Sequence, residues 1–195
     1  RYQDGSLSPL PKKHIDTGLG LERLAAILQN KGSNYDTDVF QPLIRHVSQE
    51  FGVSYGQEEK TDVALRVVAD HSRAITFTIG DGQLPGNTGA GYVIRRILRR
   101  AVRYGFQFLG ADQPFLYRLV PLLAEQFDGV FPEVKQQQDF IQQVVQEEEQ
   151  SFLRTLAVGT KLFEQQVTKL TGDTIPGAFA FELYDTYGFP LDLTR

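Results

Sequence analysis

The residues best suited to chemistry lie near the start of the chain, in the stretch KKHIDTGLGLERLAAIL at positions 12–28. Gly18 and Gly20 interrupt the approach to a predicted helix, and they leave the backbone open to a flat or charged ligand because neither carries a Cβ. The N-terminus of that helix would add a partial positive charge. Arg23 could stack on a purine or fork onto a phosphate, and Asp16 offers a carboxylate to an ammonium group.

The same stretch also has a purely structural interpretation. A turn from a strand into a helix often needs small residues, and Glu22 and Arg23 would then be ordinary solvated side chains. Short glycine motifs recur by chance, so the residues alone favour this simpler interpretation. The loop PGNTGAG at positions 85–91 is a weak phosphate cradle because it lacks the P-loop lysine, and Asn87 there could be an ordinary turn residue.

Length and composition exclude several classes of protein. The chain has 195 residues, enough to bury a core, and its net charge of −4 argues against indiscriminate binding of nucleic acid. It has no cysteine and only three histidines, without metal-binding spacing, so we expect no metal site. No apolar run reaches the ~20 residues of a membrane helix, so we expect a cytoplasmic protein without a membrane partner. Because the chain begins with Arg1 rather than Met, we expect a piece of a longer protein.

Hydrophobic periodicity predicts a mainly helical chain with one short strand at residues 13–17. The predicted helices span about residues 18–30 (stop Gly32), 34–51 (stop Gly52), 61–79 (cap Thr61), 92–104 (stop Gly105), 115–127, 134–170 and 177–187 (stop Gly188). The third of these has an apolar face of Leu65, Val68, Ala69, Ser72, Ile75 and Ile79. In the long run at 134–170, Glu148 and Gly159 interrupt the apolar seam, so we expect a bend, loose packing or a crossing contact there.

Five arginines lie beside the apolar stripe of the helix predicted at 92–104: Arg95, Arg96, Arg99, Arg100 and Arg103. A cationic helix face of this kind could follow the phosphates of a nucleic acid. It could equally pair with the acidic run at residues 147–149 or be a solvated face. Most charge runs are solvated faces, so the residues alone do not favour contact with RNA.

Four stretches together resemble a known family. DTGLGLERL resembles motif 3 of the class II aminoacyl-tRNA synthetases, and with its Asp-Thr lead it is similar to the alanyl-tRNA synthetase family in particular. NYDTDVF, ADHSRAITFTIGDGQLPGNTGAGYVIRRILRRAVRYG and LYDTYGFPLDLT agree with that family in order and spacing. The resemblance runs from about residue 11 to the C-terminus and is weakest between residues 106 and 172.

The resemblance implies a fold in two parts. Residues 1–32 would be the C-terminal end of the class II α+β catalytic domain, a strand and helix remnant that carries motif 3. Residues 33–195 would be a helical tRNA-recognition domain, truncated at its C-terminus. No trace of the first two class II motifs or of the zinc-containing editing domain is found, so we expect this part to be inactive alone and to bind no cofactor or zinc.

The resemblance also implies roles for single residues. In the family, the arginine matching Arg23 contacts ATP in catalysis, and the glycines matching Gly18 and Gly20 line the adenylate pocket. The aspartate matching Asp16 holds the amino group of alanine, and the residue matching Gly18 also borders the alanine. The intact enzyme would use ATP with Mg. Asn87 and Asp185 match the segments that read a G·U wobble pair in the acceptor stem of tRNA(Ala), and some of the five arginines would contact the same stem. Asp185 should fall near the C-terminal end of a short helix, where a negative charge is disfavoured.

The rival interpretation is a helical RNA-binding or interaction module without ATP chemistry. A synthetase requires a preference for one tRNA, whereas a generic module should show none. A free-standing nucleotide-binding enzyme is disfavoured, because one strand cannot form the antiparallel sheet that such a pocket needs. The sequence leaves the oligomeric state open.

Overall fold

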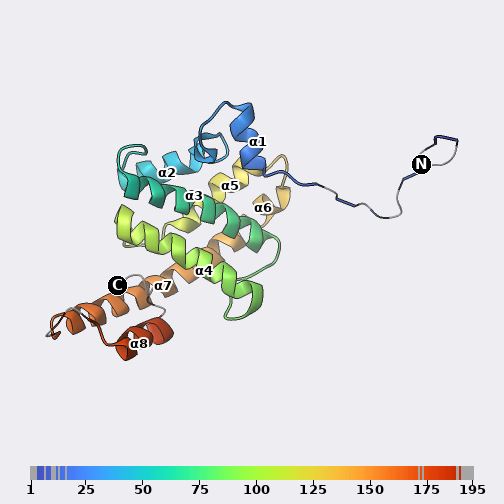
Figure 1. The fold of residues 1–195 in the computed structure, drawn as a ribbon. Coiled ribbons are helices and arrows are strands. Elements are labelled where there is room, and N and C mark those ends of the chain that lie inside the picture. The colour runs from blue at the N-terminus through green and yellow to red at the C-terminus, as the bar shows by residue number, and fades with distance from the viewer. Residues whose placement is uncertain are drawn as a thin grey trace. The chain divides into compact units, whose positions relative to one another are not determined.

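The computed structural model describes residues 4–6, 8, 9, 12, 14, 15, 17–170, 172, 174–187 and 189. Within these residues the chain is mainly helical and contains no strand (Figure 1). It divides into two compact units, residues 1–41 and residues 42–195, which are described separately below. No helix among the described residues is long and apolar enough to cross a membrane.

The first unit contains helix α1 (Leu21–Leu28), which begins directly after Gly20. The helix ends at Leu28, and the left-handed residue that follows its cap is Asn30, with a φ of 52°, so the predicted stop at Gly32 is wrong by two residues. Asparagine tolerates this conformation better than most residues and serves as a helix terminator like glycine. The strand predicted at residues 13–17 is not confirmed. Its described residues 14, 15 and 17 have no regular structure, and a lone strand would lack a partner for its backbone groups.

The cluster of capping residues at 34–38 forms a tight turn rather than the start of a helix. It contains the 3₁₀ turn η1 (Asn34–Asp36), and the Thr37 hydroxyl donates to the Asn34 carbonyl over 2.6 Å. The Gln29 side chain ties this turn to the end of α1, because its Nε2 donates to Asp38 Oδ1 over 2.6 Å. The helix predicted here is therefore α2 (Gln41–Phe51), which begins later than expected and ends at Gly52 as expected.

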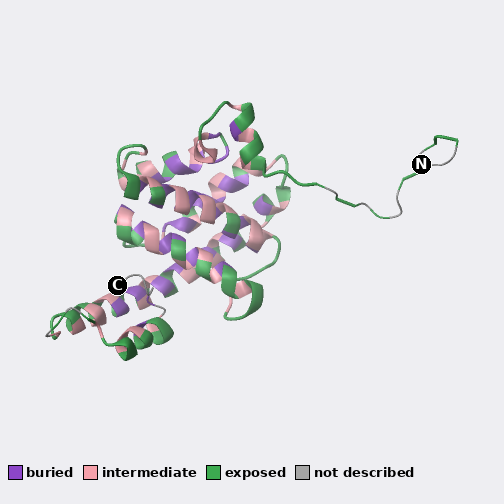
Figure 2. Cartoon of the chain, viewed as in Figure 1, coloured by how far each residue is buried: buried purple, intermediate pink, exposed green. Residues whose placement is uncertain are grey.

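The core of the second unit is built on α3 (Glu59–Gly80), which packs on α4 (Gly89–Tyr104). Its predicted apolar face is confirmed, since every one of the six residues is buried (Figure 2). The predicted cap at Thr61 is wrong. The helix begins at Glu59, and Thr61 lies buried inside the first turn, where its hydroxyl donates to the Glu58 carboxylate over 2.7 Å.

The arginine-bearing helix α4 does not stop at Gly105 as predicted. The helical backbone continues through the π-helical turn η2 (Gly105–Leu109). This segment is terminated by Gly110, whose φ is 76°. Gly105 is instead a packing position, because a Cβ there would lie 2.4 Å from Cζ of Phe115. A glycine that accommodates an aromatic ring and a glycine that ends a helix have the same sequence signature, so periodicity alone could not separate them.

The long helical run is two helices, α6 (Pro132–Gln136) and α7 (Gln138–Val167), which meet at Gln137. Gly159 of α7 is buried under Phe189, since a Cβ on Gly159 would lie 2.6 Å from Cδ2 of that ring. Of the three alternatives expected there, namely a bend, loose packing or a crossing contact, Gly159 has the crossing contact. The crossing segment follows α8 (Gly177–Tyr187), and Figure 1 shows α8 beside the C-terminal half of α7. The predicted stop at Gly188 lies outside the described residues.

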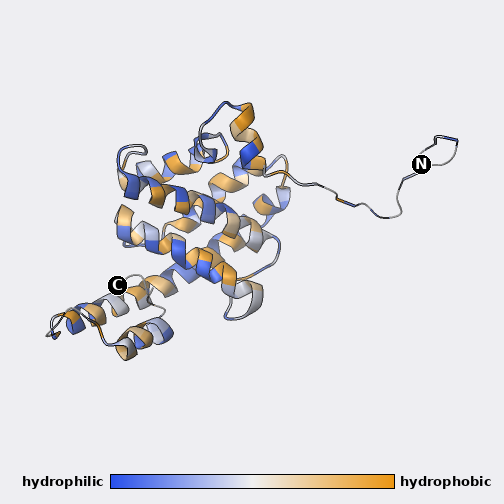
Figure 3. Ribbon diagram, viewed as in Figure 1, coloured by the Kyte–Doolittle hydropathy of each residue, from blue (hydrophilic) through white to orange (hydrophobic). Residues whose placement is uncertain are grey.

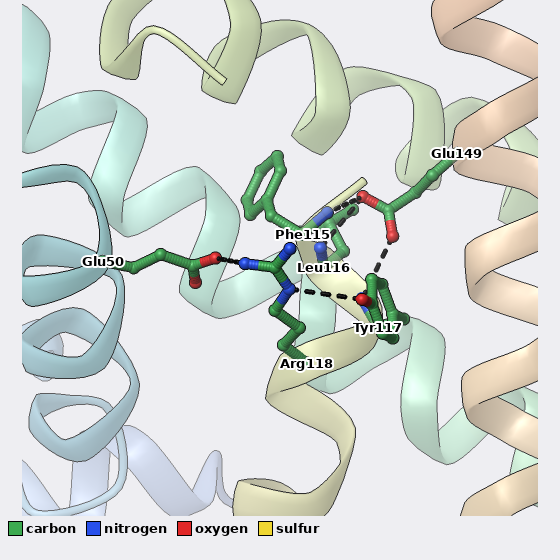
Figure 4. Close-up of polar contacts among 6 residues, drawn as sticks. All are labelled: Glu50, Phe115, Leu116, Tyr117, Arg118 and Glu149. Carbon is green, nitrogen blue, oxygen red and sulfur yellow. Dashed lines mark hydrogen bonds and ion pairs between the residues drawn. The ribbon is translucent and has the colours of Figure 1, made fainter. Parts of the chain in front are cut away.

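A buried carboxylate on α7 binds the start of a helical segment that lies earlier in the chain (Figure 4). Glu149 has no exposed surface and accepts the backbone N–H groups of Phe115, Leu116 and Tyr117 at 2.9, 2.9 and 3.0 Å. These groups open the 3₁₀ turn η3 (Leu116–Arg118), which leads into α5 (Leu119–Phe127). The first N–H groups of a helical segment have no partner within it, so Glu149 caps this segment from a distant part of the chain.

The titration of Glu149 predicts how stability depends on pH. Burial raises the pKa of the Glu149 carboxyl from 4.5 to about 7, although the hydrogen bonds from the three N–H donors act to lower this pKa. Between these two values the folded chain binds more protons than the unfolded chain, so the stability that this group contributes falls as the pH rises. We expect the difference in unfolding free energy between wild type and Glu149→Gln to fall by roughly 3 kcal/mol from pH 4.5 to 7 and then to level off.

Urea denaturation of both proteins from about pH 4.5 to 8 measures this difference, and all other titrating groups cancel between the two. If the difference rises with pH instead, the N–H donors outweigh burial at Glu149.

Candidate nucleic-acid interface

The stretch that resembles motif 3 is open in this chain. Residues 17–20 have no regular structure and are exposed. A Cβ on Gly18 would meet no atom within 4 Å, and one on Gly20 would touch only the side chains of Arg23 and Glu22, at 3.7 Å or more. Packing among the described residues therefore does not require these glycines. Arg23 is exposed on the first turn of α1, and Asp16 lies outside the described residues.

The apolar face of α1 is also exposed. Leu21, Leu24, Ile27 and Leu28 are 55%, 39%, 74% and 76% exposed, and only Ala26 of this helix is buried. Figure 3 shows hydrophobic positions along α1, and Figure 2 marks most of the same helix as exposed. An amphipathic helix normally buries such a face, so α1 carries a surface suited to packing against further protein.

The glycine-rich loop before α4 folds back on the first turn of that helix. The Gly86 N–H donates to the Gly91 carbonyl over 2.9 Å, and a Cβ on Gly91 would lie 2.7 Å from the Leu84 carbonyl oxygen. The close approach of two backbone segments explains the glycine at position 91 without a bound phosphate. Asn87 is exposed between these two segments.

Arg95 on α4 connects this loop to α7. Its Nε and Nη2 donate to the two carboxylate oxygens of Glu148 at 3.0 and 2.5 Å, the bidentate geometry that suits a guanidinium. Its Nη1 donates to Oδ1 of Asn87. The structure thus brings together two of the predicted RNA-contacting residues, Asn87 and Arg95, and adds Glu148 to them.

The other four arginines stack on aromatic rings. The guanidinium carbons lie 5.7 Å (Arg96 on Tyr92), 5.2 Å (Arg99 on Phe152), 5.6 Å (Arg100 on Tyr104) and 5.1 Å (Arg103 on Tyr104) from the ring centroids. Burial, reinforced by the charge of Arg95, lowers the pKa of the Arg99 guanidinium. Arg96 and Arg100 are the exposed members, one turn apart.

The acidic run at 147–149 has three separate roles. Glu148 binds Arg95, Glu149 caps η3, and Glu147 is exposed and accepts from Nε2 of Gln143 over 3.0 Å. The suggested pairing of the arginines with this run therefore holds for Arg95 and Glu148. The ring partners Tyr92 and Tyr104 were missed, although each stands four residues from an arginine, a spacing that places two side chains on one helix face.

Asp185 lies on a different element from the other predicted RNA-contacting residues. It is exposed in the last turn of α8, as its position in the sequence predicted. The helix α8 packs on α7, and Phe189, which follows α8 and donates its N–H to the Leu183 carbonyl, lies against Gly159 of α7. Arg95, and through it Asn87, is bound to α7 at Glu148. The two contact points on α7 are 11 residues apart, or about 16 Å along the helix.

Among the described residues, no group of three or more His, Cys, Asp or Glu side chains is placed to hold a metal ion. The candidate site combines arginine, aromatic and amide groups on a helical scaffold. Such groups suit the phosphates and bases of RNA.

Comparison with known proteins assigns the chain to a class of enzymes. The sequence model of the family described as tRNA synthetases class II (A) matches residues 1–195, and the chain belongs to this family. Its relatives include the alanine–tRNA ligases of Cytophaga hutchinsonii (61% identical), Christiangramia forsetii (58%) and Porphyromonas gingivalis (57%), each matched over 100% of the chain. The chain spans 22–23% of the length of these relatives.

Proposed function

We propose that this chain is part of an alanine–tRNA ligase, which activates alanine with ATP and transfers it to tRNA(Ala) in the cytoplasm. The observation that carries the proposal is identity of 57–61% to alanine–tRNA ligases over the whole chain. In this proposal residues 1–32 are the C-terminal end of the class II catalytic domain and residues 33–195 belong to the tRNA-recognition domain.

The open glycines support the first half of this assignment. Gly18 and Gly20 leave backbone accessible beside the exposed guanidinium of Arg23, an arrangement that admits a nucleotide. Asp16 and Gly18 would hold alanine, and Arg23 would contact ATP. The exposed face of α1 would pack on the rest of the catalytic domain. ATP would bring Mg, for which we assign no ligand among the described residues.

The chain on its own should not form alanyl-adenylate. Motif 3 supplies one side of the pocket, and catalysis requires preorganised charge on all sides of the reacting phosphate. Alanine-dependent exchange between ATP and pyrophosphate measures this step, with the full-length enzyme as the positive control. Turnover by the 195-residue chain clearly above the blank would contradict the proposal.

The alternative is a helical RNA-binding module without ATP chemistry. One observation favours it, namely that the arginines, Asn87 and Asp185 all belong to residues 42–195, a compact unit that does not include motif 3. Preference for tRNA(Ala) over other tRNAs separates the two proposals, because a generic module would bind them equally.

The exposed arginines of α4 should supply phosphate contacts that do not depend on sequence. We expect Arg96→Gln with Arg100→Gln to weaken binding about equally for cognate and non-cognate tRNA. The log–log salt dependence should flatten by about one unit or less for each lost contact. Arg45→Gln is the control for each single variant, Arg96→Gln or Arg100→Gln, since Arg45 is exposed on α2 and carries the same charge. Unchanged affinity and salt slope in the double variant would show that these arginines are only a solvated face.

Asn87 and Asp185 are proposed as the readers of a G·U wobble pair in the acceptor stem. Such a pair leaves the guanine 2-amino group free in the minor groove, which is wide and shallow in A-form RNA. An ionised aspartate only accepts hydrogen bonds, so Asp185 suits that donor. The exposure of both side chains supports the assignment.

Asn87→Ala or Asp185→Ala in the full-length enzyme should leave alanine activation nearly intact. Charging of the wobble-containing tRNA should fall by about 1–3 kcal/mol for each readout contact. A tRNA with a Watson–Crick pair at that position should lose its disadvantage in these variants. If both variants keep the wobble preference of the parent, these residues are not the readers.

A further inference from the structure

The contact between Arg95 and Asn87 fixes which end of the asparagine amide faces outward. All the polar atoms of a guanidinium are donors, so the atom of Asn87 that faces Arg95 must be its acceptor, Oδ1. The amide nitrogen Nδ2 is bonded to the same carbon and points away from Arg95. Asn87 is exposed, so it presents two N–H donors to whatever approaches the loop.

Arg95 is itself held from the other side. Its fork binds both oxygens of Glu148, and the two side chains are only 20% and 18% exposed. Arg95 lies on α4 and Glu148 on α7, two helices that pack on each other. A free arginine would lose considerable rotamer entropy on orienting a neighbour, whereas this one is already ordered by the core.

We propose that Glu148 is a positioning residue that acts through Arg95 to make Asn87 a donor toward RNA. The proposal rests on the proposed function, because it requires Asn87 to face the wobble pair. Glu148 itself makes no contact with RNA. Its carboxylate fixes the guanidinium, the guanidinium occupies Oδ1 of Asn87, and Nδ2 remains for the ligand.

The backbone around Asn87 supports this fixed orientation. The Gly86 N–H donates to the Gly91 carbonyl over 2.9 Å, and the Tyr92 N–H donates to the Thr88 carbonyl over 3.2 Å. The residues on both sides of Asn87 are thereby tied to the first turn of α4. With its backbone and its Oδ1 both held, Asn87 requires little ordering when RNA binds.

Donor character at Asn87 complements the acceptor character of Asp185. The minor groove of a G·U pair offers the guanine 2-amino group as a donor, and guanine N3, uracil O2 and the ribose 2′-hydroxyls as acceptors. Asp185 matches the donor, and a donating Asn87 matches one of the acceptors. Two fixed readers of opposite character respond to where the donor and the acceptors lie in the groove, and a wobble pair holds its bases in a different alignment from a Watson–Crick pair.

The variants Glu148→Gln and Asn87→Asp test the inference in the full-length enzyme. The readout is the wobble preference, defined as kcat/KM for charging the G·U-containing tRNA divided by kcat/KM for the G·C-containing tRNA. Glu148→Gln removes the charge that holds Arg95 and should lower this preference roughly 3- to 10-fold, since part of one readout contact is lost. Glu147→Gln is the matched control, with the same change one position away at an exposed site, and should leave the preference unchanged.

Asn87→Asp removes the two donors and keeps the size and the acceptors of the side chain. It should therefore lose the wobble preference as fully as Asn87→Ala does. Because Asn87 is exposed in a loop, this variant tests the orientation of the amide without disturbing the core. If Asn87→Asp keeps the preference, Asn87 reads the RNA as an acceptor and the inference is overturned.

A double variant separates positioning from general stability. If Glu148 acts through Asn87, then Glu148→Gln made in the Asn87→Ala background should lower the wobble preference no further. An equal loss of charging for both tRNAs, with a lower Tm, would show that the ion pair is only structural and would overturn the inference. If Asn87→Ala itself keeps the preference, both the inference and the proposed role of Asn87 fail. Loss in Asn87→Ala but not in Glu148→Gln overturns the inference alone.

Discussion

The register of α7 determines where both the core and the candidate interface lie. Glu149 of this helix is buried and accepts hydrogen bonds from three backbone N–H groups. The helix cannot rotate about its axis without leaving those donors unpaired. The next residue along the chain toward the N-terminus is Glu148, about 100° around the helix axis, and it faces Arg95. The rotational position of α7 therefore places Glu149 against η3 and the start of α5, and it places Glu148 against Arg95 on another side of the helix.

The candidate interface is assembled from long-range contacts on this helix. Asn87 reaches it through Arg95, and α8 reaches it through the ring of Phe189 seated on Gly159. Neither Asn87 nor Asp185 belongs to α7, yet Asn87 is connected to it through Arg95, and α8, which carries Asp185, packs on it. This separates the residues proposed to contact RNA from the residues that decide where those contacts are made.

The sequence predicted the parts of the fold that follow from local periodicity. The buried face of α3, the end of α2 at Gly52 and the break in the apolar seam at Gly159 are all visible as patterns of apolar or small residues. The prediction failed where a residue has several possible roles. Thr61, Gly105 and Gly32 have the chemistry of caps and stops, but those roles belong to Glu58, Gly110 and Asn30 in the structure.

The candidate interface shows the same limit. The five arginines and the acidic run were evident from composition, but which glutamate binds which arginine was not. Glu147, Glu148 and Glu149 are indistinguishable as a string, and only the direction in which α7 presents each of them gives it a partner. Such contacts join residues more than thirty or fifty positions apart, and no local pattern encodes them.

The seat of Phe189 on Gly159 has a consequence for how variants of this protein should be screened. The contact lies on the C-terminal half of α7, beyond the buried residues Ile141, Val145 and Phe152 that face the core. A larger side chain at position 159 would displace the ring and tilt α8, while the helices of the core stay packed. Under the proposed function, this displacement would move Asp185 and so alter the choice of tRNA, whatever it does to stability. A screen that measures only abundance or melting temperature would not measure that property, whereas an assay of tRNA discrimination would.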